Sequence, residues 1–185
     1  GEGRSENIKL SKYHFSVIEE LYLQRDEEEL FFQLEEKYER LKENHSIKDV
    51  PAPKHLKEVL RPYQESGFQW LNYLREVRWG GILADDMGLG KTIQSITYLL
   101  WLRDEEAKEK GGLDKVAPSL VVCPKSVIDV WHAETEKFAP NLRVKILRTR
   151  DDLDLKVLET EVDIFVLNYA QLRLCGEELA KVKWL

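Results

Sequence analysis

The stretch from Gly80 to Thr92 constrains the fold most. An apolar run, residues 80–84, leads into a glycine-rich turn and then into a helix that opens with Lys91 and Thr92. Gly88 and Gly90 let the backbone turn its N–H groups toward an anion, and the new helix adds its unpaired donors and positive dipole end. In such a loop Lys91 would reach the β- and γ-phosphates of a nucleotide, and the Thr92 hydroxyl would ligate Mg²⁺.

The match to the general phosphate-loop pattern G-x-x-x-x-G-K-[ST] departs at one position, because Asp85 stands where the pattern has its first glycine. A coincidental surface turn is therefore the alternative. The flanking sequence favours the phosphate loop, because Ile82-Leu83-Ala84 reads as a buried strand and the following segment has an apolar face at helical spacing. That face consists of Ile93, Ile96, Thr97, Leu99, Leu100 and Trp101.

The composition is typical of an intracellular protein that folds. Hydrophobic residues make up 43% of the chain and charged residues 34%, with a net charge of −6. An acidic balance argues weakly against nucleic acid as a partner, although a local basic track can still meet phosphates. Only Cys123 and Cys175 are present, too few for a disulfide framework, and Cys123 is expected to be a buried thiol. No membrane segment is expected.

The Pro51-Ala52-Pro53 segment marks a change of pattern, and we predict two regions, residues 1–56 and 57–185. The first is a small helical accessory region, with helices expected at 16–23 and 26–43. The apolar face of the second helix is expected to dock on the neighbouring domain. A dimerising coiled coil is the alternative, but the apolar repeat covers few heptads.

Residues 57–185 alternate between helix-like and strand-like segments, which predicts an α/β fold with a parallel sheet covered by helices on both faces. Phosphate loops occur at the carboxyl ends of such strands. The expected helices are 61–77, 91 to about 107 and 126–138, and the expected strands lie near Ile82 and at 119–123, 143–147 and 163–168.

Four stretches of this second region resemble the motifs of the Snf2 family of DNA translocases, in helicase superfamily 2. They are Leu60-Arg61-Pro62-Tyr63-Gln64-Glu65-Ser66-Gly67 (the glutamine motif), Ile82 to Thr92 (motif I), Leu120-Val121-Val122-Cys123-Pro124-Lys125-Ser126 (motif Ia), and Asp163-Ile164-Phe165-Val166-Leu167-Asn168-Tyr169 (motif Ib). The resemblance also accounts for Asp85, because this family does not keep the first phosphate-loop glycine. It implies the N-terminal part of a first RecA-like lobe that uses ATP and Mg²⁺.

The resemblance implies a role for each matched position. Lys91 and Thr92 are expected to act in catalysis, with Thr92 on the metal. Gln64 would pair with adenine and reject guanine, because its amide offers a donor beside an acceptor; an ordinary exposed helix glutamine is the alternative. The expected cofactor-binding residues are Arg61, Gln64, Asp86, Met87, Gly88, Leu89, Gly90, Lys91 and Thr92.

Double-stranded DNA is the implied partner, held through its backbone at Pro124-Lys125-Ser126, where a strand ends and a helix begins. Ser126 is also a candidate helix cap with Asp129 as a box-like partner, and both roles can hold together. Trp131 is expected in the core. At Asn168-Tyr169-Ala170 the sequence departs from the family pattern, so no DNA contact is carried over there.

The carboxylate pair of motif II and the arginine finger of the second lobe cannot be assigned in this sequence. We therefore expect a translocase fragment that is inactive alone and is completed by a further chain or segment, with residues 80–84 as an exposed apolar edge. A non-catalytic ATP-binding or protein-interaction module is the alternative function. A small-molecule kinase or GTPase fits less well, because no Asn-Lys-x-Asp guanine reader is present. The expected location is cytoplasmic and nucleoid-associated in a bacterium, or nuclear in a eukaryote.

Overall fold

The computed structural model describes residues 47–185. The helices expected at 16–23 and 26–43 lie outside the described residues. The described chain forms two compact units, residues 51–68 with 83–185, and residues 47–50 with 69–82. The expected regions, 1–56 and 57–185, stay a prediction.

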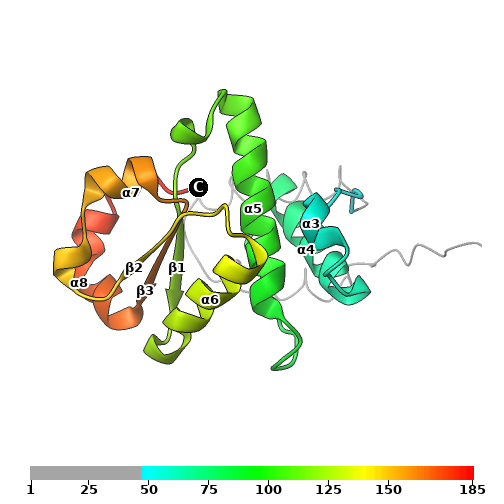
Figure 1. Ribbon diagram of the computed structural model, residues 1–185, viewed down its shortest axis with the longest axis horizontal. Helices are drawn as coiled ribbons and strands as arrows, with labels where there is room; N and C mark the ends of the chain where they lie inside the picture. Colours follow the sequence, from blue (N-terminus) through cyan, green and yellow to red (C-terminus); the bar gives the residue numbers. More distant parts are fainter. Residues whose placement is uncertain (1–46) are drawn as a thin grey trace, which may run out of the picture. The chain divides into compact units, whose positions relative to one another are not determined.

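The larger unit contains a parallel three-stranded sheet (Figure 1). Its strands are β1 (Ser119–Cys123), β2 (Val144–Leu147) and β3 (Ile164–Asn168), in the order β1-β3-β2. Both outer strands pair with β3 in parallel, so that Val166 stands between Val121 and Ile146. The three strands confirm the segments expected from the sequence, two of them one residue shorter at the start.

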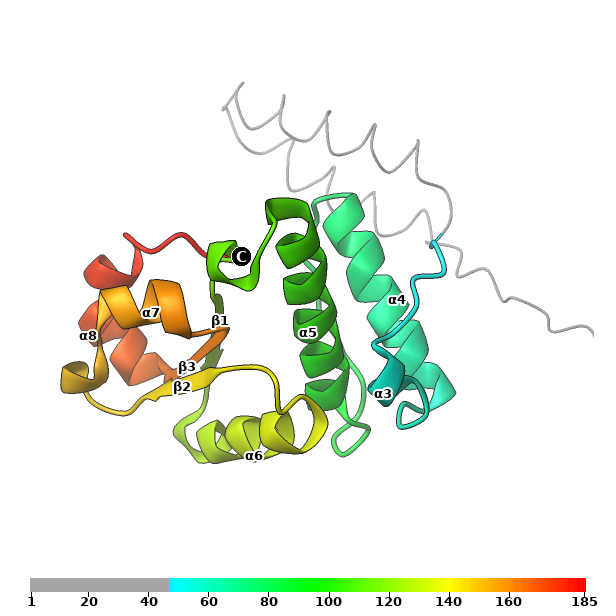
Figure 2. The same ribbon diagram turned by 45° about the horizontal axis from the view of Figure 1, so that its top comes forward.

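Helices connect these strands and cover both faces of the sheet, as predicted. Figures 1 and 2 both show α6 on one side of the strands, with α7 and α8 on the other. The helices are α3 (Lys54–Lys57), α4 (Pro62–Glu76), α5 (Lys91–Lys110), α6 (Ile128–Phe138), α7 (Leu155–Glu161) and α8 (Tyr169–Leu179), with short 3₁₀ turns η1 (Leu113–Lys115), η2 (Lys125–Val127) and η3 (Arg150–Asp152). Within residues 47–185, no helix has the length and hydrophobicity required to cross a bilayer.

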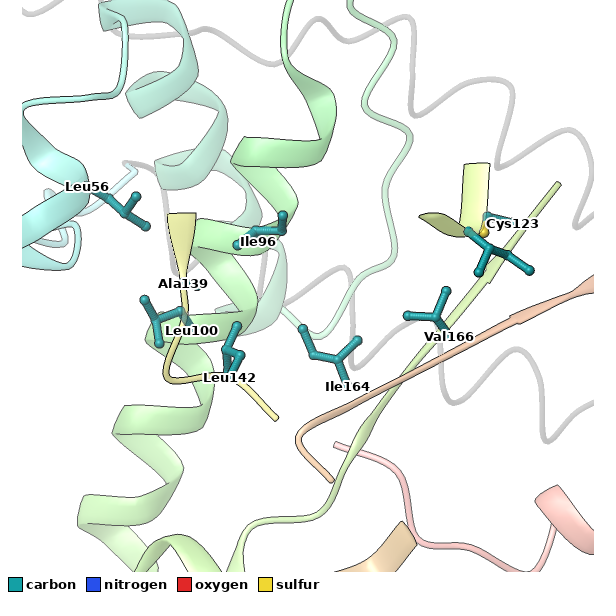
Figure 3. Close-up of a cluster of buried hydrophobic side chains, with 9 residues drawn as sticks. Leu56, Ile96, Leu100, Cys123, Ala139, Leu142, Ile164 and Val166 are labelled. Atoms are coloured by element: carbon teal, nitrogen blue, oxygen red, sulfur yellow. The ribbon is translucent and has the colours of Figure 1, made fainter. Parts of the chain in front are cut away.

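The central strand β3 supplies side chains to two hydrophobic cores, because successive residues of a strand face opposite ways. Ile164 and Val166 belong to the core beside α5 and α6 (Figure 3). Its other buried members are Leu56, Ile96, Leu100, Cys123, Ile128, Ala139 and Leu142, with Trp131 packed against them as expected. Phe165 and Leu167 belong to the core beside α7 and α8, with Leu147, Leu158, Val162, Cys175, Leu179 and Val182. Burial also raises the pKa of the Cys123 thiol.

A buried carboxylate, Asp163, fixes the start of β3. Arg143 Nη2 donates to Asp163 Oδ1 at 2.8 Å, and Arg103 Nη1 of α5 donates to Asp163 Oδ2 at 3.3 Å. Burial alone would raise the pKa of Asp163, but the hydrogen bonds and charge of Arg143, helped by Arg103, outweigh burial and lower that pKa. This cluster therefore links α5 to the starts of β2 and β3 through an ionised aspartate.

The strand expected near Ile82 does not form. Residues 79–86 have no regular secondary structure and no strand pairing, and the Ile82 side chain is 87% exposed. The apolar pattern indicated a strand, but a strand also needs a neighbour for its backbone groups, and none of the described strands pairs with this segment. The Ile82 side chain is therefore exposed in a segment that has no strand partner among the described residues.

The helix expected at 126–138 begins later, at Ile128, and Ser126 does not cap it. The 3₁₀ turn η2 comes first, and the residue before the helix is Val127, which offers no capping side chain. Asp129 pairs instead with Arg148, through an Arg148 Nη2 to Asp129 Oδ1 bond of 2.5 Å. The predicted Ser126–Asp129 box was therefore wrong, because the turn moves Ser126 out of the capping position.

Candidate functional site

The loop before α5 takes the conformation that the glycine pattern predicts. Gly88 and Gly90 have φ angles of +82° and +80°, which side chains with a Cβ rarely adopt. Gly90 is the residue that precedes α5, and no side chain caps that helix. The first-turn N–H groups of α5 therefore remain available to an external anion. In Figure 1 this loop lies at the lower end of α5, the end toward which the strand arrows point.

The Lys91 ammonium is folded onto the carbonyl oxygens of its own loop. Nζ donates to the oxygen of Asp85 at 2.5 Å and to the oxygen of Asp86 at 3.1 Å. Lys91 and its neighbour Thr92 are both half-buried at the start of α5. The loop thus encloses a cation at the point where phosphate oxygens are expected to enter.

The glutamine expected to read adenine contacts this loop. Gln64 Nε2 donates to the carbonyl oxygen of Leu89 at 3.0 Å, and Gln64 Oε1 accepts the backbone N–H of Arg61 at 3.0 Å. Gln64 is only 7% exposed. The alternative of an ordinary exposed glutamine is therefore wrong, and this side chain joins the start of α4 to the phosphate loop.

The other expected cofactor-binding residues differ in their surroundings. Arg61, Asp86, Met87, Gly88 and Leu89 are exposed, with Met87 96% exposed. The backbone carbonyl of Asp86, rather than its side chain, holds Lys91. Sequence and structure therefore place the expected residues around one loop, with the Arg61 and Met87 side chains directed to solvent.

Two residues at this loop, Tyr63 and Gln94, were given no role in the sequence analysis. The Tyr63 hydroxyl donates to the same Leu89 oxygen at 2.9 Å, beside Gln64. Gln94 Nε2 donates to Asp85 Oδ2 at 2.7 Å, and Gln94 is fully buried. A signal for Gln94 was present, because it is a polar residue that follows Ile93 on the face that carries Ile96 and Leu100.

The expected DNA-binding turn is exposed and lies at the carboxyl end of β1. The side chains of Pro124, Lys125 and Ser126 are all exposed. The helix that follows, α6, has no side-chain cap, whereas Asp154 caps α7 and Asn168 caps α8. The turn therefore presents a cation and a hydroxyl beside free helix-start donors, a combination that suits a phosphate.

The described residues contain no cluster of three or more His, Cys, Asp and Glu side chains that could hold a metal ion. Thr92 is the expected metal contact within the loop. A Mg²⁺ ion in a phosphate-loop site is bound through one or two protein oxygens plus the nucleotide phosphates. The half-buried hydroxyl of Thr92, next to Lys91, is compatible with that role.

The chain is similar to known proteins of one family. A family model described as "SNF2-related domain" matches residues 63–185. The ISWI chromatin-remodeling complex ATPase ISW2 of Saccharomyces cerevisiae is 38% identical over 130 residues, 68% of this chain, and the helicase SWR1 of Candida albicans is 46% identical over 98 residues, 53% of it. Among solved structures, the Sulfolobus solfataricus SWI2/SNF2 ATPase core in complex with dsDNA is 36% identical, covers 75% of this chain and has a TM-score of 0.54.

The chain spans only a small part of these proteins. It covers 11% of ISW2, 6% of SWR1 and 26% of the solved Sulfolobus chain. The residues that the family model matches, 63–185, include the loop before α5 and the sheet, and the fold agrees with the α/β expectation drawn from the sequence.

Proposed function

Because the chain belongs to the SNF2-related domain family, within helicase superfamily 2, we propose that it is the ATP-binding part of the first RecA-like lobe of a double-stranded-DNA translocase or remodeller. The family consists of ATP-dependent enzymes, as the names of its relatives state. The observation that carries the proposal is the loop before α5, with two left-handed glycines, an uncapped helix and the Lys91 ammonium at its centre.

ATP is the proposed cofactor, with its phosphates over residues 86–92. Gly88 leaves the loop open, because a Cβ built there would meet no atom within 4 Å. Lys91 would exchange the Asp85 and Asp86 oxygens for phosphate oxygens, which are stronger acceptors for an ammonium. Thr92 would contribute a hydroxyl to Mg²⁺. When bound, the metal supplies positive charge that neutralises the phosphates.

Adenine recognition is proposed for Gln64, whose amide groups are now bonded to Leu89 and Arg61. A base that pairs with the amide must replace at least one of these bonds. Arg61 bonds to Gln64 through its backbone N–H, and Met87 belongs to the same loop as Leu89. Both side chains are exposed, so they are the proposed flanks of the nucleotide.

Double-stranded DNA is the proposed partner, held by its backbone at Pro124, Lys125 and Ser126. Support comes from the uncapped start of α6 and from the Sulfolobus relative, which was solved in complex with dsDNA.

Lys125→Ala should weaken duplex binding about equally for different sequences and reduce the slope of log affinity against log salt by about 1. Lys156→Ala, an exposed lysine on α7, is the matched control. An unchanged salt slope for Lys125→Ala would rule out this contact.

A further segment or chain is proposed to complete the motor and to pair with β1 at its open edge. The backbone N–H of Leu185 already donates to the Pro118 oxygen at 2.9 Å, next to the first residue of β1. A strand along that edge would pair with the backbone groups of β1 that no described strand reaches. It would also bring the carboxylates that hydrolysis requires.

We predict that the purified chain alone does not turn over ATP, with or without duplex DNA, since hydrolysis needs a metal-binding carboxylate, a group that orients water and a cation on the γ-phosphate. The measurement is phosphate release by the natural sequence and by Lys91→Ala. Robust release that is lost on Lys91→Ala would contradict the incomplete motor. ATP binding whose affinity does not depend on DNA would favour the non-catalytic binding module.

In a eukaryote we expect the protein in the nucleus, and in a bacterium on the nucleoid.

A further inference from the structure

Asp85 occupies the position where the general phosphate loop has a glycine, and its side chain has a specific partner. Its carboxylate oxygen Oδ2 accepts a 2.7 Å bond from Gln94 Nε2, while its backbone oxygen accepts a bond from Lys91 Nζ. One residue at the start of the loop is therefore tied to two positions in the first turn of α5. Neither contact needs a nucleotide.

The Gln94 amide can point only one way. A carboxylate accepts hydrogen bonds and does not donate, so Gln94 must present Nε2 to Asp85. The same Nε2 lies 3.4 Å from the Gly90 oxygen, which closes the other end of the loop. One buried amide therefore spans from the first loop residue, Asp85, to the last, Gly90.

The oxygen end of the Gln94 amide has room because Gly67 has no side chain. Gln94 Oε1 is buried and has no hydrogen-bond partner among the described residues. It lies against Gly67, where a Cβ would stand 1.8 Å from Oε1. Since an unpaired buried oxygen is unfavourable, the arrangement is kept at a cost in stability, which indicates a purpose other than packing.

We propose that Asp85 and Gln94 are positioning residues that hold the phosphate loop open for ATP, in place of the missing glycine. The inference rests on the proposed ATP-binding function. When Lys91 turns from the loop carbonyls to a phosphate, the loop loses the bonds from Nζ to Asp85 and Asp86. The Asp85–Gln94 bond does not involve Lys91, so it keeps the loop in shape at that moment.

The test reverses the donor and the acceptor of this bond. Gln94→Glu places two carboxylates in contact and should weaken binding of a non-hydrolysable Mg²⁺–ATP analogue by about tenfold or more. Asp85→Asn keeps an oxygen that accepts from Gln94 and should stay within about threefold of the natural protein. In the double variant the new asparagine donates to the new glutamate, so analogue affinity should return. A simple loss of packing would not be restored by this exchange.

The matched control is Gln171→Glu on α8, since Gln171 also has a buried oxygen without a partner and belongs to a different helix. Its analogue affinity should be unchanged, and circular dichroism should show that each variant is folded. If Gln94→Glu fails to fold, Gln94→Met removes the donor without adding charge and should show the same loss of analogue affinity.

Lys91→Ala separates the positioning role of Asp85 and Gln94 from the ATP site itself. Weaker binding by Lys91→Ala with natural affinity in the Gln94 variants, or a double variant no better than Gln94→Glu, overturns the positioning role alone. Natural affinity in Lys91→Ala overturns the ATP site itself.

Discussion

The carboxylate of Asp163 is held by the guanidinium groups of Arg103 and Arg143, and its side chain is 4% exposed. Asp163→Ala would remove one of the two carboxylates that pair with Arg103, itself 9% exposed, and would leave that buried guanidinium with Asp104 alone. We predict a loss of roughly 3 kcal/mol in unfolding free energy, the lower end for a broken buried pair because Arg143 is half exposed. Urea unfolding measures this change.

The pKa of Asp163 gives this prediction a pH dependence. Because the pKa is lowered in the folded state, the carboxylate stabilises the protein above its unfolded pKa. That contribution is lost as pH falls below about 4, through the folded pKa. The stability difference between the natural sequence and Asp163→Asn should therefore shrink on acidification. Asp129→Asn, in an exposed pair with Arg148, is the control and should change stability by less than about 1 kcal/mol. An equal effect of both substitutions would contradict the buried cluster.

Gln64 is predicted to affect nucleotide choice as well as stability. Gln64→Ala removes the bonds to Leu89 and Arg61, and the lost helix-start contact should cost about 1 kcal/mol. If the amide reads adenine, the preference for ATP over GTP should also fall by about tenfold. Competition binding with both nucleotides measures the ratio. A ratio unchanged in Gln64→Ala would leave Gln64 with a structural role only.

The loop before α5 contains two glycines that differ in their neighbours, which allows a comparison within one element. Both have positive φ, so alanine at either position should cost about 1–2 kcal/mol through backbone strain. At Gly90 the new Cβ would also stand 2.4 Å from Gln64 Nε2, whereas at Gly88 it would meet nothing within 4 Å.

Gly90→Ala is therefore predicted to lower the melting temperature more than Gly88→Ala, and to disturb the Gln64–Leu89 bond. Differential scanning calorimetry of the two variants gives the comparison. Equal losses would mean that backbone strain alone decides, and that Gln64 moves aside without cost.

Elements with a local cause could be predicted from the sequence. The start of α5 at Lys91 follows from the glycine turn, and β1 at 119–123 follows from a short apolar run. The segment near Ile82 has an equally good apolar pattern but no strand, because pairing depends on a partner far along the chain. Ser126 failed as a cap because the backbone first makes the turn η2.

The candidate site shows the same division. Gly88, Gly90 and Lys91 could be identified from their spacing, because a phosphate loop is a local motif. The bonds from Tyr63 and Gln64 to Leu89, and from Gln94 to Asp85, connect residues from different elements. No short-range pattern predicts them.

For the whole molecule, the sheet implies an order of local stability. β3 is the central strand, and its residues 164–167 are all buried, whereas β1 and β2 each have an open edge among the described strands. We predict that β3 amides exchange with solvent most slowly and that residues 80–84 exchange fast. Hydrogen exchange measured by NMR tests this order. Slow exchange in residues 80–84 would contradict the unpaired segment.

The loop that precedes α5 is the proposed ATP site, and ATP binding there is the central prediction. The most direct measurement is calorimetric binding of a non-hydrolysable Mg²⁺–ATP analogue to the natural protein, to Lys91→Ala and to Lys125→Ala, each checked for folding. We predict that Lys91→Ala weakens binding by about tenfold or more, while Lys125→Ala, altered only in the turn proposed to contact DNA, binds as the natural protein does. Unchanged affinity in Lys91→Ala, or no binding by the natural protein, would contradict ATP binding by this loop.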